Sequence, residues 1–473
     1  MWHIAHVNRR KVVVDMDNSA HAQVVSETVN RFVVVAAGVA ALGGFLFGFD
    51  TGIISGALLF IREEFGLSAG FQQVVVGSLL LAAVVGALLG GPISDGWGRK
   101  RTLILAALLF GLGALLAGYS PNVAVLVAAR VLLGLAIGIA SMIVPVYIAE
   151  IAPPRVRGAL VSLQQFMITV GIMVSYLVSY ALSGAGAWRW MLGLAVVPAV
   201  ALFVGMFPLP ESPRWLLAKD RRQDALGVLR RIRHEEHNPE AELAEIEAVH
   251  RMQAGVGYGD LFRRSVRPAL VVGVGIAFFN QMVGVNAVIY YAPSILEDAG
   301  FSASAAILAT TGVGIVNMLV TLCALLLIDR LGRRPLLVIG MSGVLLSLLV
   351  LGGAYLLPGD PSAVGFLLVV GLMVYIASFA ASLGIAIWLL NSEVYPLEVR
   401  GKGAAAGAFT HWALDFVIAS TVLTMIATIT PTGMFWFYGI FAILGIIFVL
   451  RRVPETKGRT LEDVSDELAK RAG

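Results

Sequence analysis

The sequence is poor in charged residues and in cysteine for a chain of its length. Of its 473 residues only 14% are charged, and Cys323 is the single cysteine. Soluble domains carry about 25% charged residues, so the composition excludes a water-soluble globule and an ordinary cytosolic enzyme. A lone cysteine also excludes a secreted scaffold held together by disulfides. The net charge is only +4 and the basic residues are dispersed in short clusters, which argues against nucleic acid as a partner.

Hydrophobic residues, in contrast, are abundant and are arranged in long runs. They make up 58% of the chain, and the mean hydropathy is +0.86. A helix needs about 20 apolar residues to cross a bilayer, and counting the runs on this basis predicts twelve membrane-spanning helices. The spans at 32–60, around 130–149 and at 403–429 each contain one isolated charge, and a break at 430–433 separates the last two helices.

The lysine and arginine residues predict how the chain is oriented. With the N-terminus placed inside, 31 of the 34 basic residues fall in predicted cytoplasmic segments. This bias follows the positive-inside rule and predicts a multi-pass protein of the cytoplasmic membrane with both termini in the cytoplasm. The first 31 residues lack the short apolar core of a cleavable signal.

Three pairs of loop motifs recur along the chain. GPISDGWGRKR at 91–101 matches LIDRLGRR at 327–334, EIAPPRVRG at 150–158 matches EVYPLEVRG at 393–401, and PESPRWL at 210–216 matches PETKGRTLE at 454–462. The offsets are 234, 243 and 244 residues, which indicates duplication of a six-helix unit. Parallel repeats of this kind are a known transporter plan, with the substrate site near the midplane between the repeats.

The duplication predicts an all-α polytopic membrane protein with two pseudo-symmetric six-helix bundles. We expect a cytoplasmic N-terminal segment at 1–31, bundles at 32–210 and 266–451, and a cytoplasmic tail at 452–473. The polar stretch at 211–265 is the predicted linker, with amphipathic helices at 221–235 and 239–252.

These motifs, together with FNQMVGVNAVIYYAP at 279–293, resemble the sugar porter family of the major facilitator superfamily. The resemblance extends from about residue 33 to residue 461. It implies import of a monosaccharide or polyol by alternating access, coupled to protons and without a cofactor. We expect a monomer whose partners are the sugar and the lipid bilayer.

The loop motifs combine acidic and basic residues at predicted cytoplasmic helix ends. One interpretation is topological: the basic residues simply hold the loops inside. The other is a set of ion pairs that close the cytoplasmic side, because arginine–carboxylate pairs can alternate between two discrete states. The resemblance implies the second role for Asp95, Arg99, Glu150, Arg157, Glu211, Arg214, Asp329, Arg333, Glu393 and Arg400.

Two ionisable residues lie within predicted membrane helices. Asp50 is in the middle of the first helix and Arg130 is near the start of the fourth. Such groups are costly in a bilayer and indicate function. They could form a static pair that holds two helices together, or a proton switch in which the arginine contact alters proton affinity. In proton-coupled sugar porters an aspartate at the position of Asp50 is the expected coupling residue.

Uncharged polar residues within apolar helices suggest where a sugar binds. Buried amides are costly without partners, although each could also bond a neighbouring helix. Gln281 and Asn286 are five residues apart, about 140° round a helix, so they would face a common cavity only obliquely. The candidates for substrate binding are Gln165, with Gln164 beside it, and Asn280, Gln281, Asn286, Trp388, His411 and Trp412.

The resemblance sharpens this set. Gln165, Gln281, Asn286 and Trp388 match family ligands, and Phe47, Tyr290 and Tyr291 match aromatic lining and gating positions.

The chain also departs from the family pattern. Asn280 replaces a glutamine, and Ile385 replaces a proline, which argues against the usual break in the tenth helix. His411 and Asp415 replace amides in the eleventh helix. They share a helix face, as an ordinary pair or as a second titrating element.

Other functions fit the sequence less well. A passive uniporter of the same substrates is the nearest alternative to proton-coupled import. A sensor that does not transport usually adds a long cytoplasmic tail, and only about 20 residues follow Pro454. A membrane enzyme would need a metal-ligand cluster or a nucleophile triad, and the sequence suggests neither.

Overall fold

The structure is a computed structural model that describes residues 30–233, 238–253, 256–357 and 361–471. Within these residues it is helical and contains no strand. The predicted N-terminal segment 1–31 lies almost entirely outside the described residues, as does the end of the tail, 472–473.

The first half of the molecule holds six membrane crossings. They are α2 (Arg31–Phe65), α3 (Ala69–Trp97), α4 (Arg99–Tyr119), α5 (Val123–Ile151), α6 (Arg157–Ser183), and the pair α7 (Trp188–Gly193) and α8 (Val196–Met206), which together form the sixth. Side-chain caps start several of them; the Ser68 hydroxyl, for example, accepts from the N–H of Phe71 at the start of α3. Such caps satisfy N–H groups that a helix leaves free.

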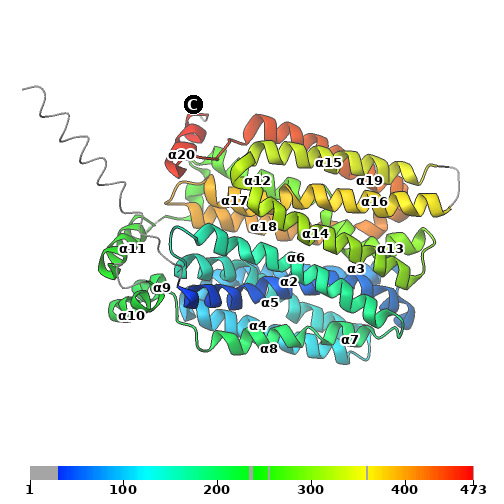
Figure 1. Cartoon of the computed structure of the whole chain (residues 1–473), viewed down its shortest axis with the longest axis horizontal. Helices are drawn as coiled ribbons and strands as arrows, with labels where there is room; N and C mark the ends of the chain where they lie inside the picture. Colours follow the sequence, from blue (N-terminus) through cyan, green and yellow to red (C-terminus); the bar gives the residue numbers. More distant parts are fainter. Residues whose placement is uncertain (1–29, 234–237, 254–255, 358–360, 472–473) are drawn as a thin grey trace, which may run out of the picture.

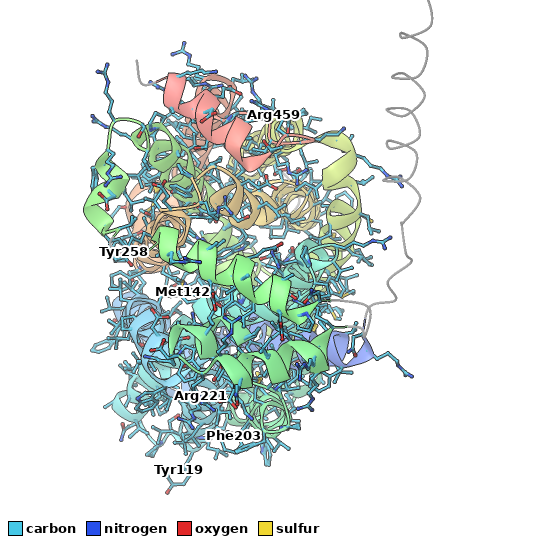
Figure 2. The ribbon with its side chains drawn as sticks, turned by 90° about the vertical axis from the view of Figure 1, so that its left-hand side faces the viewer. Tyr119, Met142, Phe203, Arg221, Tyr258 and Arg459 are labelled. Carbon is cyan, nitrogen blue, oxygen red and sulfur yellow. The ribbon has the colours of Figure 1, made fainter. Side chains whose placement is uncertain are left out.

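Short helices follow the first half. They are α9 (Pro213–Ala218), α10 (Arg222–Ile232), α11 (Pro239–Gln253) and the 3-10 turn η1 (Tyr258–Phe262). Helices α10 and α11 agree with the two predicted amphipathic helices. Figure 1 shows α9–α11 and the C-terminal helix α20 (Leu461–Lys470) at one end of the molecule, here called the linker end. The opposite end is the far end. Figure 2 looks onto the linker end, where the green linker helices cross it near Arg221.

The second half repeats the arrangement, and its seventh and tenth crossings are each divided between two helices. It contains α12 (Arg267–Met282) and α13 (Val285–Asp298), α14 (Ala303–Leu331), α15 (Arg333–Ala354), α16 (Pro361–Ala380) and α17 (Leu383–Glu393), α18 (Arg400–Ala419) and α19 (Val422–Arg452). In Figure 1 these helices lie above α2–α8. The two halves therefore lie side by side, with their long helices running in roughly the same direction.

The structure agrees with the predicted count of twelve crossings. Among the described residues, eleven helical segments are long and apolar enough to span a membrane. Helix α18, with 20 residues and a polar face that includes His411 and Asp415, supplies most of the eleventh crossing and completes the set. Thr430, with φ 64° and ψ 163°, interrupts α19 before Pro431, which is where the sequence predicted the break between the last two helices.

Backbones approach closely inside the first half. A Cβ placed on Gly48 of α2 would lie 1.9 Å from the carbonyl oxygen of Ile168 on α6, and one on Gly52 would lie 2.0 Å from the Ser175 hydroxyl. A Cβ on Gly138 of α5 would lie 2.2 Å from the carbonyl oxygen of Ala83 on α3. In a bilayer, where hydrophobic burial between helices contributes little, small residues permit the van der Waals contact that holds helices together. Helices α2 and α6 are thus joined along a glycine seam.

Candidate functional site

A buried ion pair joins α2 and α5 within the first half. Arg130 Nη1 lies 2.8 Å from Asp50 Oδ1 and 2.7 Å from Asp50 Oδ2, and the two side chains are 1% and 2% exposed. Arg130 Nε also donates to the carbonyl of Val75 on α3, at 3.4 Å. The structure therefore brings together the two intramembrane charges that the sequence singled out.

A cavity lies between the two halves, beside this pair. It has about 650 Å³ of empty volume, including its open mouth. Thr51 lines it, so Asp50 is one residue from its wall. The polar residues of the lining are Thr51, Gln165, Thr169, Asn280, Gln281, Asn286, Asn317, Thr321, Trp388, His411 and Asp415.

Most of the predicted substrate-binding residues line this cavity. They are Gln165, Asn280, Gln281, Asn286, Trp388 and His411. Trp412 is fully buried instead, and its ring packs against Phe47, which does line the cavity, with centroids 5.0 Å apart. The indole thus supports the wall through Phe47.

Several polar residues of the wall were not assigned to the site from the sequence. Asn317 carried the clearest signal, because it is an amide within the apolar helix α14 and the reasoning that selected Gln165 applies equally to it. The threonines were harder to identify. Thr51, for example, donates to the carbonyl of Phe47 on its own helix at 2.8 Å, so a threonine in such a helix need not indicate a ligand site.

A break between α12 and α13 brings the amides into contact. Gly284 adopts φ 85°, a left-handed conformation that costs glycine little. Asn286 Nδ2 therefore donates to Gln281 Oε1 at 2.8 Å, and Gln281 Nε2 lies 2.9 Å from His411 Nδ1. The expectation that Gln281 and Asn286 face a common cavity only obliquely is wrong, because it assumed an unbroken helix; both residues line the same cavity.

The tenth crossing is also interrupted, although Ile385 replaces the usual proline. Helix α16 ends at Ala380 and α17 begins at Leu383, with Ser382 at φ −130° and ψ −90°. Asn280 Nδ2 donates to the carbonyl of Leu383 at 3.0 Å. The argument against a break is therefore wrong, and a side chain from α12 supplies a hydrogen bond at the interruption. Trp388 follows on α17, with its ring 5.4 Å from that of His411.

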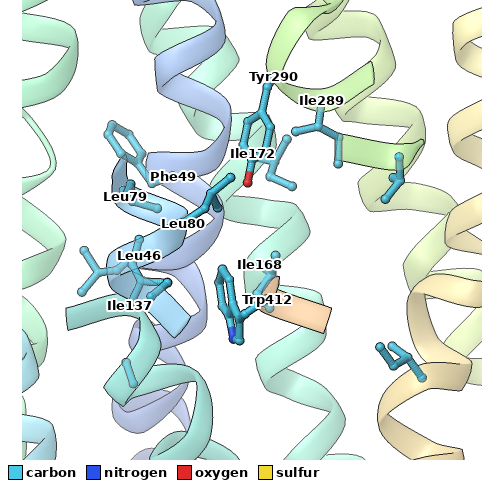
Figure 3. Close-up of a cluster of buried hydrophobic side chains, with 14 of the residues drawn as sticks. Leu46, Phe49, Leu79, Leu80, Ile137, Ile168, Ile172, Ile289, Tyr290 and Trp412 are labelled. Atoms are coloured by element: carbon cyan, nitrogen blue, oxygen red, sulfur yellow. The ribbon is translucent and has the colours of Figure 1, made fainter. Parts of the chain in front are cut away.

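The two predicted gating tyrosines lie on α13, and both are buried. The Tyr290 hydroxyl donates to Asp415 Oδ2 at 3.3 Å, and the Tyr291 hydroxyl donates to the carbonyl of Ala419 at 2.8 Å. Figure 3 shows Tyr290 and Trp412 reaching from the second half toward Ile172 and Ile168 of α6. Both tyrosines thus tie α13 to α18 next to the boundary between the halves.

Direct contacts join the two halves near the far end. Arg62, close to the end of α2, pairs with Glu297 at the end of α13 at 2.5 Å. The Ser183 and Ser304 hydroxyls are 3.0 Å apart, and the Tyr176 hydroxyl donates to the carbonyl of Ile289 at 3.1 Å. In this structure the far end is therefore the side on which the halves are held together. Arg62 was not among the site residues predicted from the sequence.

Arg62→Gln is expected to loosen the far end without unfolding the protein. The paired side chains are 24% and 21% exposed, and such a pair contributes up to about 1 kcal/mol. Its loss should shift the balance toward an open far end by up to about fivefold. The labelling rate of Ile289→Cys by an impermeant thiol reagent, in a Cys323→Ser background, measures this shift.

The matched control for that experiment is a pair within one half. Arg189 and Glu64 also lie near the far end, 2.7 Å apart, but α7 and α2 both belong to the first half. Arg189→Gln should leave the labelling rate unchanged. Equal labelling in the two variants would show that Arg62 and Glu297 do not hold the halves together.

The linker end repeats one arrangement in both halves. Arg99 Nε lies 3.0 Å from Glu150 Oε2, and Arg333 Nη2 lies 3.0 Å from Glu393 Oε1. Glu211 accepts from the N–H groups at positions 99 and 100, and Glu455 accepts from those at positions 333 and 334. These contacts preserve the internal repeat that the motifs predicted. The two arginine–glutamate pairs each join helices of the same half.

The two equivalent glutamates differ in proton affinity. Burial raises the pKa of Glu211 above its ordinary value, and the N–H donors around it offset this only in part. Burial also acts on Glu455, but the backbone N–H groups that it accepts lower its pKa overall. A carboxylate that accepts several N–H bonds is stabilised in its charged form. Glu455 therefore keeps its negative charge to lower pH than Glu211 does.

The remaining residues predicted for the cytoplasmic gate have varied surroundings. Asp95 is largely exposed and pairs with Arg99 at 3.0 Å. Arg400 Nε lies 3.4 Å from the carbonyl of Tyr395. Arg157 and Arg214 are partly buried on α6 and α9. The side chain of Asp329 lies outside the described residues.

Two six-crossing halves around a polar cavity define a membrane transporter. Comparison with known proteins identifies its family. A family profile described as "Sugar (and other) transporter" matches residues 36–468, and the chain belongs to this family. It is a transporter of the major facilitator superfamily and not an enzyme.

Relatives that are named as sugar transporters align with nearly the whole chain. The D-xylose transporter of Levilactobacillus brevis is 40% identical over 92% of this chain and 95% of its own length. The galactose-proton symporter of Escherichia coli (strain K12) is 41% identical over 91% and 93%. The structure of the proton:xylose symporter XylE, from E. coli, bound to 6-bromo-6-deoxy-D-glucose superimposes with a TM-score of 0.79, at 30% identity, covering 93% of this chain and all of that one.

Proposed function

We propose that this protein imports a monosaccharide or polyol across the cytoplasmic membrane together with protons. The relatives named above are transporters of xylose and galactose, and two of them are named as proton symporters. The observation that carries the proposal is the buried Asp50–Arg130 pair directly behind a cavity lined with amides.

The cavity suits a ligand with many hydroxyl groups. Amide side chains both donate and accept hydrogen bonds, and Gln165 from the first half faces Gln281 and Asn286 from the second across the same space. The Trp388 indole offers an apolar plate for the face of a sugar ring. Because both halves contribute donors and acceptors, a bound sugar would hold them together.

The ion pair suits proton coupling. Asp50 is balanced by Arg130 here, but a carboxylate that parts from its cation in a buried site is costly unless it binds a proton. Separation of the Asp50 carboxylate from the Arg130 guanidinium would thus exchange the arginine contact for a proton. If the pair instead stays intact throughout the cycle, the protein is a passive uniporter.

We further propose that the two bundles, 32–210 and 266–451, rock against each other as units joined by the linker 211–265. The linker end faces the cytoplasm, as the distribution of basic residues indicates. With this orientation, the far-end contacts, Arg62–Glu297 among them, close the outer side. The ion pairs of the linker end stabilise each bundle when the inner side closes.

Uptake by purified protein in liposomes tests this function. The substrates tested are D-xylose, D-glucose, D-galactose, L-arabinose and myo-inositol, each carrying a label. Uptake is measured under an inward proton gradient, with and without a protonophore. One proton crossing 100 mV supplies about 2.3 kcal/mol, which supports roughly 50-fold accumulation. Uptake that reaches equal concentrations and ignores the protonophore would establish facilitated diffusion instead.

A further inference from the structure

A second buried acid lies in the second half, and the proposed coupling does not use it. Asp415 on α18 is 1% exposed and lines the cavity. Its Oδ2 accepts from the Tyr290 hydroxyl at 3.3 Å, whereas its Oδ1 is buried without a hydrogen-bond partner. Among the described residues no cation lies within ion-pair distance of it. Asp50 differs in this respect, because Arg130 contacts both of its oxygens.

The surroundings of Asp415 supply little charge to balance it. His411 lies one turn earlier on α18 and bonds to Gln281. Tyr290 contacts it from α13, and behind Tyr290 lies the Asp50–Arg130 pair, whose charges oppose each other. The helices α3, α12 and α17 carry charged residues only toward the linker end.

A buried carboxyl in such a place is less costly when it is neutral. An ionised carboxylate moved out of water without a cation or several hydrogen bonds costs far more than the neutral acid. Besides Tyr290, the uncharged Asn286 side chain also lies next to this carboxyl. Oδ1 has no hydrogen-bond partner and is the atom that can hold a proton. A purely structural role would be filled as well by an asparagine, which needs no proton.

The position of Tyr290 links this acid to the far end. Tyr290 lies on α13, which begins after Gly284 in its left-handed conformation and ends at the Arg62–Glu297 pair. A swing of α13 about Gly284 would remove the Tyr290 hydroxyl from Asp415 and admit water in the same movement. Hydration of the acid is therefore tied to opening of the far end.

We propose that Asp415 is a second proton-binding group of the transport cycle, so that two protons enter with each sugar. This inference rests on the proposed function. With the far end open, a hydronium ion from outside gives its proton to the carboxylate, forming an O–H bond at Oδ1. The neutral acid is then buried as α13 closes. When the cavity opens to the cytoplasm, that O–H bond breaks and the proton passes to water. Charge and atoms balance without an oxidant or reductant.

The test is a proton count in liposomes, with the accumulation of a transported sugar measured against the imposed proton-motive force. Each proton adds about tenfold accumulation per 60 mV. The wild type should reach about 100-fold at 60 mV, and Asp415→Asn should fall to about tenfold. Asp415→Glu, which keeps a protonatable group, should retain the steeper dependence. Asp50→Asn should not accumulate sugar although Asp415 remains, because without the Asp50 switch sugar can cross in either direction whether or not Asp415 holds a proton.

The outcomes separate this proposal from the function on which it rests. A wild type that accumulates only about tenfold at 60 mV overturns the second proton while leaving symport intact. An unchanged slope in Asp415→Asn also overturns it. A wild type that does not accumulate sugar contradicts the proposed function itself. If Asp415→Asn fails to fold, the wild-type slope and the Asp415→Glu slope still decide, because a slope of one proton in either overturns the proposal.

Discussion

Replacing Asp50 by asparagine is expected to abolish uphill accumulation while leaving exchange of sugar across the membrane. Asparagine has nearly the same shape and keeps an oxygen for Arg130 Nη1, which lies 2.7–2.8 Å from the native carboxylate, but it cannot carry a proton. At 100 mV the accumulation ratio should fall from at least about 50 to about 1. Energised uptake and counterflow in the same liposomes measure the two activities.

The control for this variant is an aspartate outside the membrane. Asp224 pairs with Arg221 on the linker, and both side chains are more than half exposed. Asp224→Asn should therefore accumulate sugar as the wild type does. Accumulation that persisted in Asp50→Asn would show that the proton is carried elsewhere. Loss of counterflow as well would show that Asp50 is needed for movement itself.

Removing the other partner is expected to have a large effect on stability. Arg130→Met leaves the Asp50 carboxylate buried without a cation, and breaking a buried pair in this way costs about 3–5 kcal/mol. Because Arg130 also donates to Val75, its loss weakens contacts of α5 with both α2 and α3. Thermal unfolding in detergent, followed by tryptophan fluorescence, measures the change.

A second substitution separates the lost charge from the lost packing. Asp50→Asn combined with Arg130→Met removes both charges, and we expect the double variant to recover most of the stability. Arg130→Lys keeps a cation and should be destabilised less than Arg130→Met. A double variant as unstable as Arg130→Met would mean that the arginine acts through its packing and not through its charge.

The number of crossings and the main ion pair could be predicted because they depend on burial of charge. Charged residues are so costly in a bilayer that their spacing outlines the helices, and two isolated charges of opposite sign are expected to meet. The kink at Thr430 could be predicted for a similar reason, since the last apolar run was too long for one crossing. These features depend on the composition of a segment and little on its neighbours.

The interruptions of the seventh and tenth crossings could not be predicted in the same way. The break at Gly284 changes which faces Gln281 and Asn286 present, and a glycine within a helix does not by itself indicate a break. The break before Leu383 is supported by Asn280, about 100 residues away in the chain. The Arg62–Glu297 contact was also out of reach, because its partners are 235 residues apart in the chain and belong to different halves.

The glycine seam between α2 and α6 limits what can move. The backbones of the two helices are in contact, since a Cβ added at Gly48 would lie only 1.9 Å from a carbonyl oxygen of α6. Neither helix can therefore slide or tilt alone without a steric clash. Asp50 on α2 and Gln165 on α6 must therefore move together as one rigid unit. The distance between spectroscopic labels on α2 and α6 should stay constant throughout turnover. The distance between labels on α2 and α13 should change each time the cavity switches from one side of the membrane to the other.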